Sequence, residues 1–235
     1  MNSNSSASSV SCQRIRSVLA VATLSALGLS PVLTHAQGQA QSARAGRLDA
    51  NLDLLTFRAS GDTPYAPGCS GTPDTGTLYA NGEVEPFAAV NPRYPLNLIG
   101  VWQQDRWSNG GARGLGTGYS FDGGITWKRV FPPFSRCAGG NADNNGDYER
   151  ATDPWVSFSP NGVAHQMALS FDDAITPGKP ASAMLASRST DGGRTWSKSI
   201  VLVADTEERF NDKNTMTADP TDSRYVYAVW DRLSF

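Results

Sequence analysis

The chain has 235 residues, with 20 basic and 22 acidic side chains and a formal net charge of −2. It contains no Lys/Arg run and no basic stripe, so the electrostatic footprint of a nucleic-acid-binding protein is missing and nucleic acid is not an expected partner. After Ala36 no apolar stretch reaches the length that a membrane-spanning helix needs, so no membrane span is expected.

Residues 1–36 have the layout of a secretory signal peptide. Arg14 and Arg16 precede a short apolar run, residues 18–29, and a small-x-small motif ends at Ala36. The run is too short to span a membrane; a buried N-terminal helix is the alternative interpretation. We therefore expect cleavage near Ala36 and a mature chain that is secreted or periplasmic.

Residues 37–84 are predicted to be an extended lead-in, because their middle part is rich in Gly, Pro and Thr. This segment contains Cys69, and Cys137 is the other cysteine of the mature chain. An even pair of cysteines in an oxidising compartment favours a disulfide. Two unpaired thiols are the alternative.

A repeat begins at residue 85. Equivalent Xaa-Pro pairs occur at 91–92, 159–160 and 219–220, each between short segments rich in β-branched and aromatic residues. Each repeat is predicted to supply about four strands, and those of the first repeat are expected at roughly 86–90, 97–104, 115–120 and 126–131. The sequence thus predicts an all-β chain with two complete four-stranded antiparallel units and the start of a third. Propeller blades or a repeating sandwich would have this pattern.

The octets SFDGGITW (120–127) and STDGGRTW (189–196) agree at six of eight positions. Paired glycines permit positive φ, the aspartate can accept backbone N–H bonds, and the tryptophan opens the next strand with a large apolar surface. The octet is therefore predicted to be a structural hairpin between the third and fourth strands. The residues that would form it are Ser120, Asp122, Gly124, Thr126 and Trp127, and Ser189, Asp191, Gly193, Thr195 and Trp196.

The pattern S-x-D-G-G-x-T-W resembles the Asp-box, or BNR repeat, of sialidases. Similar boxes occur in ten-bladed sortilin-type receptors, in xyloglucan-cleaving glycosidases and in a photosystem assembly factor. The resemblance covers about residues 85–235 and implies a sialidase-like β-propeller, in which the box is structural and lies away from the active site. It also implies a glycan or glycoconjugate as the partner.

A closed propeller at this repeat length needs more than about 300 residues. The sequence is therefore interpreted as a partial propeller, a fragment of a longer product, with closure by oligomerisation as the alternative. The sequence leaves the oligomeric state open. Uncovered blade faces and strand edges predict poor solubility of residues 1–235 alone.

In an antiparallel meander the octets share one end of the blade with the connections between strands one and two. The opposite end, which carries the active site in sialidase-like propellers, is expected to hold long polar loops. These loops are predicted at 104–116, 136–153, 171–182 and 204–213.

Glycoside cleavage needs a proton donor and a second stabilising group, and arginine suits a substrate carboxylate. The candidate catalytic acids on the expected loops are Asp147, Glu149 and Asp153, and the candidate substrate-binding residues are Arg106, Arg113 and Arg150. Solvated loop charges or salt bridges are the alternative interpretation. Glu85, Asp153 and Lys213 occupy equivalent positions at the start of the first strand of each repeat, where side chains can face the central axis.

Asp143, Asn145 and Asp147 place oxygen ligands on alternate residues, as calcium loops do, although a plain polar turn gives the same pattern. No other metal or cofactor is expected. The sequence has no Arg-Ile-Pro stretch ahead of the first repeat, so no catalytic residue is transferred from the family by motif. The expected function is a secreted sialidase-like glycoside hydrolase of the exo-α-sialidase type. The alternative is a non-catalytic Asp-box propeller that binds glycans or proteins.

Overall fold

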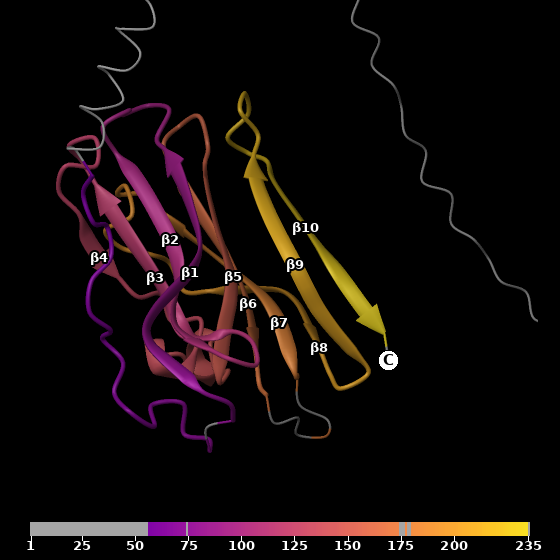
Figure 1. Ribbon diagram of the computed structural model, residues 1–235. Helices are drawn as coiled ribbons and strands as arrows, with labels where there is room; N and C mark the ends of the chain where they lie inside the picture. Colours follow the sequence, from indigo (N-terminus) through magenta and orange to yellow (C-terminus); the bar gives the residue numbers. More distant parts are fainter. Residues whose placement is uncertain (1–55, 74, 174–176, 178–179, 235) are drawn as a thin grey trace, which may run out of the picture. The chain divides into compact units, whose positions relative to one another are not determined.

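The structure is a computed structural model that describes residues 56–73, 75–173, 177 and 180–234 (Figure 1). The predicted signal peptide and the first part of the lead-in lie outside the described residues. The described part contains ten β-strands, two short 3-10 helices and no α-helix. No helix in this part has the length and apolar character needed to cross a membrane. The described part is all-β, as the sequence predicts.

In chain order the elements are β1 (Leu78–Val90), β2 (Leu98–Trp107), β3 (Ala112–Ser120), β4 (Lys128–Val130), the 3-10 helices η1 (Arg136–Ala138) and η2 (Ala142–Asn144), β5 (Arg150–Phe158), β6 (Ala164–Phe171), β7 (Ser182–Ser189), β8 (Ile200–Asp205), β9 (Arg209–Ala218) and β10 (Val226–Ser234).

The strands form two antiparallel meanders and a hairpin. β1 to β4 pair in sequence, and β5 to β8 do the same. β9 pairs with β10 in a separate two-stranded sheet. A single residue pair, Ala112 with Ala151, connects β3 to β5. The antiparallel pairing in chain order agrees with the predicted all-β arrangement, and through the Ala112–Ala151 pair β1 to β8 form one hydrogen-bonded sheet.

Glycines at alternate positions of β3 make room for aromatic side chains on one face of the first meander. A Cβ added at Gly116 would lie 2.3 Å from the ring of Trp102, and one added at Gly114 would lie 2.3 Å from the hydroxyl of Tyr65. Positions two apart in a strand face the same side of the sheet. Trp102 and the lead-in residue Tyr65 therefore pack closely against this strand.

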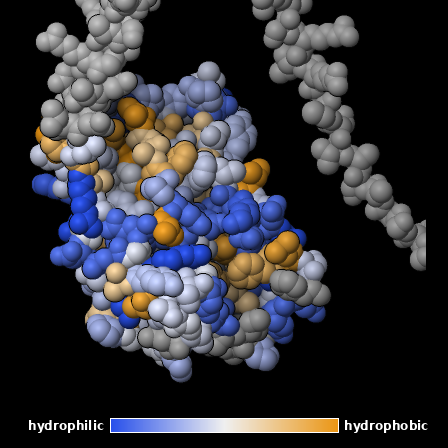
Figure 2. All heavy atoms as spheres, viewed as in Figure 1, coloured by the Kyte–Doolittle hydropathy of each residue, from blue (hydrophilic) through white to orange (hydrophobic). Residues whose placement is uncertain are grey.

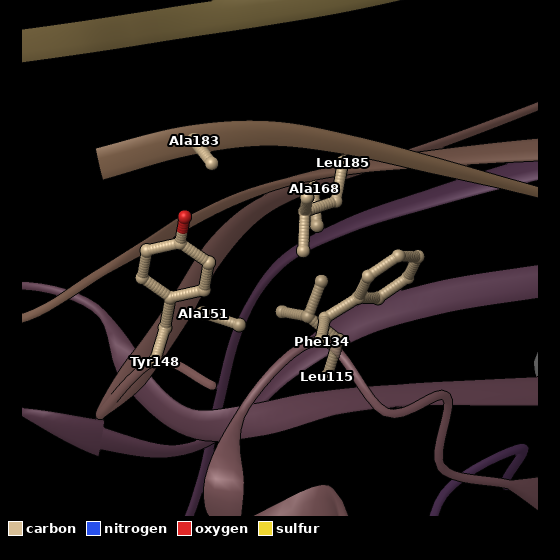
Figure 3. Packing of buried hydrophobic residues seen from close by; sticks show 7 residues of the cluster. All are labelled: Leu115, Phe134, Tyr148, Ala151, Ala168, Ala183 and Leu185. Carbon is tan, nitrogen blue, oxygen red and sulfur yellow. The ribbon is translucent and has the colours of Figure 1, made fainter. Parts of the chain in front are cut away.

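The sheets pack on one another in chain order through three buried clusters. The first joins β3 to β5, β6 and β7 and consists of Leu115, Phe134, Tyr148, Ala151, Ala168, Ala183 and Leu185 (Figure 3). The second joins β2 to β5 and β6, and the third joins β6 and β7 to β9. On the face viewed in Figure 2, hydrophilic residues form a broad band between separate hydrophobic residues.

Each octet forms a hairpin turn with the same hydrogen bonds. The Ser120 hydroxyl donates to Asp122 Oδ1 (2.8 Å) and accepts from the Gly124 N–H (2.9 Å), and Asp122 Oδ1 accepts the Thr126 N–H (2.9 Å). The second octet repeats these bonds from Ser189 and Asp191, at 2.7, 2.9 and 3.0 Å. Both glycines of each pair have positive φ, as a hairpin connection of this kind requires. The octets therefore act as turn-forming elements, as their composition indicates.

The two octet hairpins lie side by side. The side-chain amide of Asn97, in the connection between β1 and β2, donates to Ser120 O and to Gly192 O, each at 3.0 Å. The guanidinium of Arg194 lies 3.8 Å from the ring centroid of Phe121. One buried amide thus holds both turns at the same end of the sheets.

Cys69 and Cys137 form a disulfide, which confirms the predicted pairing. The bridge fastens the lead-in to η1, in the connection that follows β4. The 68-residue separation makes it a long-range cross-link. Its chief effect is on the unfolded chain, where it restricts the conformations open to a long loop.

Two of the four connections predicted at the end opposite the octets are shorter than expected, whereas the connection between β6 and β7 has the expected extent. The expected loop 104–116 is only a turn at 108–111, and the expected loop 204–213 is reduced to 206–208. β1 also begins earlier than expected, at Leu78. The difference arises because charged residues such as Asp105 and Arg113, which suggest loops, lie buried within strands and are paired there.

Candidate functional site

The first strands of the three repeats, β1, β5 and β9, are neighbours in space. β5 contacts both β1 and β9, although about 60 residues of sequence separate successive members of the set. β1 and β5 run in the same sense, because Phe87 stacks on Trp155 two positions after Glu85 meets Asp153. β9 also runs in this sense, because Asn214 bonds to Asp153 O and the Ala218 N–H bonds to Ser157 four positions later. Equivalent residues of the three strands therefore lie close together.

A β-bulge interrupts the middle part of each of these strands. Glu85, Asp153 and Lys213 have φ values of 52°, 50° and 51°, in the left-handed region that non-glycine residues rarely adopt. The register of each strand with its partner shifts at or beside these positions. A bulge re-aims side chains and costs about 1–3 kcal/mol of backbone strain for each such residue. The threefold recurrence shows that the strained conformation is part of the repeat.

The three bulges line one pocket of about 350 Å³. Glu85 and Lys213 are exposed, and Asp153 is half-buried. Phe87 and Trp155 stack on each other, with ring centroids 3.9 Å apart and planes 20° from parallel. The complete lining is Glu85, Pro86, Phe87, Asp153, Pro154, Trp155, Lys213 and Asn214. The pocket thus combines two carboxyls, one ammonium group and an aromatic wall.

The two carboxyls interact. Although Glu85 as a residue is exposed, partial burial of its carboxyl raises the pKa, and the neighbouring Asp153 carboxyl raises the pKa further. An N–H bond from Gln103 and the charge of Arg106 act in the opposite direction, but the net pKa of Glu85 is raised. Two close carboxyls disfavour double ionisation, so one of them retains a proton to higher pH.

Buried polar residues behind the pocket hold these carboxyls. The side-chain amide of Gln103 donates to Glu85 Oε2 and to Thr152 Oγ1, the latter at 2.7 Å. The Thr152 hydroxyl in turn donates to Asp153 Oδ1, also at 2.7 Å. Asn214 donates to the backbone carbonyl of Asp153 (2.9 Å) and ties β9 to β5.

The other two predicted acids do not line this pocket. Asp147 is ion-paired with Arg136 (2.7 Å) and lines a second pocket of about 400 Å³ beside Tyr148 and Asp172. Glu149 is buried, contacts Arg150 (3.4 Å), and accepts the backbone N–H of Asp173. Asp153 is therefore the only one of the three candidate acids that lines this pocket, where it lies beside Glu85, its equivalent in the first repeat.

The three predicted arginines lie in different environments. Arg150 is fully buried and reaches Asp173 Oδ2 (3.2 Å) and Asn109 Oδ1 (2.9 Å). Arg113 is buried, 3.7 Å from the carboxylate of Asp105. Arg106 is partly exposed and donates to Gln103 Oε1 (3.1 Å) and Gly111 O (3.0 Å). Of these three arginines, only Arg106 is connected to the pocket, because it donates to Gln103, which in turn donates to Glu85.

The residues predicted as calcium ligands take part in the turn that follows η1. Asp143 lies in η2, capped by Asn141, and Asn145 ends this helix with φ 64°. The amide of Asn145 donates to Ser199 O (2.6 Å), and Asp147 is paired with Arg136. Among the described residues no group of three or more Asp, Glu, His or Cys is placed to hold a metal ion. Calcium binding at this turn stays a prediction.

Gln103 and Thr152 behind the pocket were not predicted from the sequence, nor were Phe87, Trp155 and Asn214 in its lining. Gln103 lies in the run WQQD, where polar residues continue a β-strand that begins as apolar. Consecutive polar residues at the end of a buried strand are the signal that could have identified it, because buried amides need partners.

Comparison with protein-family models found no match. Comparison with curated protein sequences found no match either. Among solved structures, the chain is similar to one described as the Hadza microbial sialidase Hz136, with 22% identity and a TM-score of 0.37. The similarity covers 52% of this chain and 27% of that one, so the chain spans about a quarter of that structure's length.

Proposed function

We propose that this chain is part of an exported, sialidase-like glycoside hydrolase that acts at the pocket between β1, β5 and β9. The observation that carries the proposal is the pairing of Glu85 and Asp153, which equivalent bulges of neighbouring strands direct into one pocket. N-terminal sequencing of the exported protein, expected to begin near Gln37, tests the predicted signal peptide.

The packing supports a propeller-like arrangement. Each four-stranded meander buries a face against the next unit in the chain, and the three first strands are adjacent. Consecutive blades of a propeller have this relation. We interpret the described part as two blades and the start of a third, with the pocket between their first strands.

The carboxyl pair suits acid-assisted cleavage of a glycosidic bond. The raised pKa of Glu85 favours the protonated form, which can donate to the leaving oxygen. An ionised Asp153 would stabilise the positive charge that develops in an oxocarbenium-like transition state. Lys213 lines the pocket and Arg106 adjoins it through Gln103, and such cations suit a substrate carboxylate, so a sialoside is the first substrate to test.

The test is turnover of a fluorogenic sialoside and of a panel of neutral fluorogenic glycosides by the purified chain. We expect Glu85→Gln and Asp153→Asn each to reduce turnover by at least about 100-fold, the usual contribution of a positioned proton donor. Glu83→Gln is the matched control, because Glu83 lies in the same strand but pairs with Arg58. Equal loss in all three variants would argue against a specific role for the pair.

A second candidate is a non-catalytic propeller that binds glycans at the same pocket. The burial and pairing of Arg113 and Arg150 favour it, because these guanidinium groups already have carboxylate partners. Binding of the chain to immobilised glycans, abolished by Asp153→Asn and without turnover of any glycoside, would support this candidate over the enzyme.

A further inference from the structure

Gln103 lies at the point where the polar network behind the pocket converges. It belongs to β2, and its side chain is fully buried, although it is one of the more polar side chains in the core. A buried amide is costly unless its hydrogen-bonding groups have partners. Each of the three hydrogen bonds of this side chain leads toward the carboxyl pair or toward Arg106.

Arg106, on the side away from the pocket, fixes the orientation of the Gln103 amide. Arg106 donates to Gln103 Oε1 (3.1 Å), and an arginine can only donate. The amide oxygen must therefore face Arg106, and the NH₂ group must face the pocket. There Nε2 donates to Glu85 Oε2 and to Thr152 Oγ1.

The same NH₂ group reaches both carboxyls, one directly and one through a hydroxyl. Because the Thr152 oxygen accepts from Gln103, its own proton is free to be donated, and it goes to Asp153 Oδ1 (2.7 Å). Glu85 on β1 and Asp153 on β5 are thus connected through a single side chain of β2.

We propose that Gln103 is the positioning residue of this site: its buried amide holds the carboxyl of Glu85 directly and that of Asp153 through Thr152. The contribution of Gln103 to catalysis rests on the proposed function, whereas its positioning of the two carboxyls can be tested without turnover. Groups held by packed neighbours in this way lose little motion when a substrate binds.

The charged groups around Glu85 determine how the pKa of Glu85 responds to a substitution at Gln103. Asp153 approaches it from β5 and Arg106 from β2, and Lys213 of β9 lines the same pocket. The N–H bond from Gln103 favours the ionised form of Glu85 and so lowers its pKa against burial and Asp153. Its removal therefore shifts the titration of Glu85 to higher pH.

The experiment is a carbon-13 NMR titration of the side-chain carboxyls in the chain labelled at glutamate, with Glu85→Gln used to assign the signal. We expect the Glu85 midpoint to rise in Gln103→Leu and in Gln103→Glu, the second of which keeps the size of the side chain and adds a like charge. If the proposed function holds, turnover in both variants falls by about 100-fold, the cost of a misplaced reacting group.

Gln166→Leu is the control, because Gln166 is also buried and bridges two hydroxyls, of Thr117 (3.1 Å) and Ser187 (2.9 Å), away from the pocket. It should lower stability and leave the Glu85 titration unchanged. An unchanged Glu85 midpoint in whichever Gln103 variant folds overturns the proposal, as does an equal shift in Gln166→Leu. A shifted midpoint in a chain that cleaves no glycoside would keep the positioning role and reject the hydrolase.

Discussion

At the scale of single residues, Asp122 shows how the octet turns depend on an ionised carboxylate. The Thr126 hydroxyl and backbone N–H donate to it, and so does the Ser120 hydroxyl, and together they lower the pKa of Asp122 to about 2. An aspartate in the unfolded chain has a pKa of about 3.9. The unfolded state therefore binds protons first, and the stabilisation from Asp122 is present above about pH 4 and is lost as the pH falls toward about 2.

Asp122→Asn tests this dependence. We expect the variant to melt at a lower temperature than the wild type at neutral pH, because its amide cannot accept as strongly from Thr126. Between about pH 4 and 2 the wild type should lose melting temperature faster than the variant, so that the two curves converge. Circular dichroism melts across this range measure both slopes. Parallel curves would contradict the assigned role of the carboxylate.

Asp191 offers an independent comparison at the second octet. Burial by itself would raise the pKa of Asp191, but hydrogen bonds from Thr195 and Ser189 outweigh burial and leave the pKa lowered. We therefore expect Asp191→Asn, like Asp122→Asn, to make the melting temperature fall less steeply on acidification than it does in the wild type.

The sequence predicted residue roles where the repeat constrains the backbone. The paired glycines permit the positive φ of the turn, and the octet serine and aspartate can accept backbone N–H bonds within it, so the bonding pattern follows from composition. Alignment of repeats also brought Glu85, Asp153 and Lys213 together. The burial of Arg150 could not be predicted in this way, because its partners Asn109 and Asp173 come from connections far apart in the sequence.

At the scale of elements, the order of strands was more predictable than their ends. Apolar alternation and turn residues determine where a strand must exist, whereas its length depends on which polar residues find partners in the sheet. β2 illustrates the point. It continues through Asp105, which accepts from the Thr63 hydroxyl (2.7 Å) and the Asn81 N–H (2.8 Å), and these partners lie in the lead-in and β1.

The disulfide between the lead-in and η1 is the element-scale feature with the largest expected effect on stability. In the chain-entropy model, closing a loop of this length stabilises the folded state by about 4 kcal/mol. We expect the double variant Cys69→Ser/Cys137→Ser to unfold at a lower urea concentration by a corresponding amount.

Reductant provides the control for this variant. It should lower the unfolding midpoint of the wild type to that of the serine variant and leave the variant itself unchanged. Equal midpoints for the oxidised and reduced wild type would mean that the bridge contributes no stability, and that other contacts hold the lead-in, such as Tyr65 against Gly114.

At the scale of the whole described unit, the hydrophobic layers between successive sheets leave one side uncovered. β9 and β10 pair with each other, and residues of β10 alternate between the two faces of this hairpin. Ala228 and Trp230 pack toward β6 and β7, whereas Tyr227 and Val229 are exposed, the latter by 60%. The described part of the chain thus presents an apolar outer face at β10, and exposed Ile200 and Leu202 on β8 line a cavity of about 560 Å³ next to it.

This uncovered face predicts association of the chain in solution. Exposed apolar strands with unpaired edges favour pairing with further copies, because burying them removes apolar surface from water. We expect static light scattering to give an average mass above that of one chain, and Val229→Lys, which places a charge on the outer face of β10, to lower it. Ile125→Lys is the control, since Ile125 is similarly exposed but lies in an octet turn rather than on β10. A monodisperse monomer of the unmodified chain, with cooperative thermal unfolding, would contradict this prediction and mean that the exposed face of β10 needs no partner.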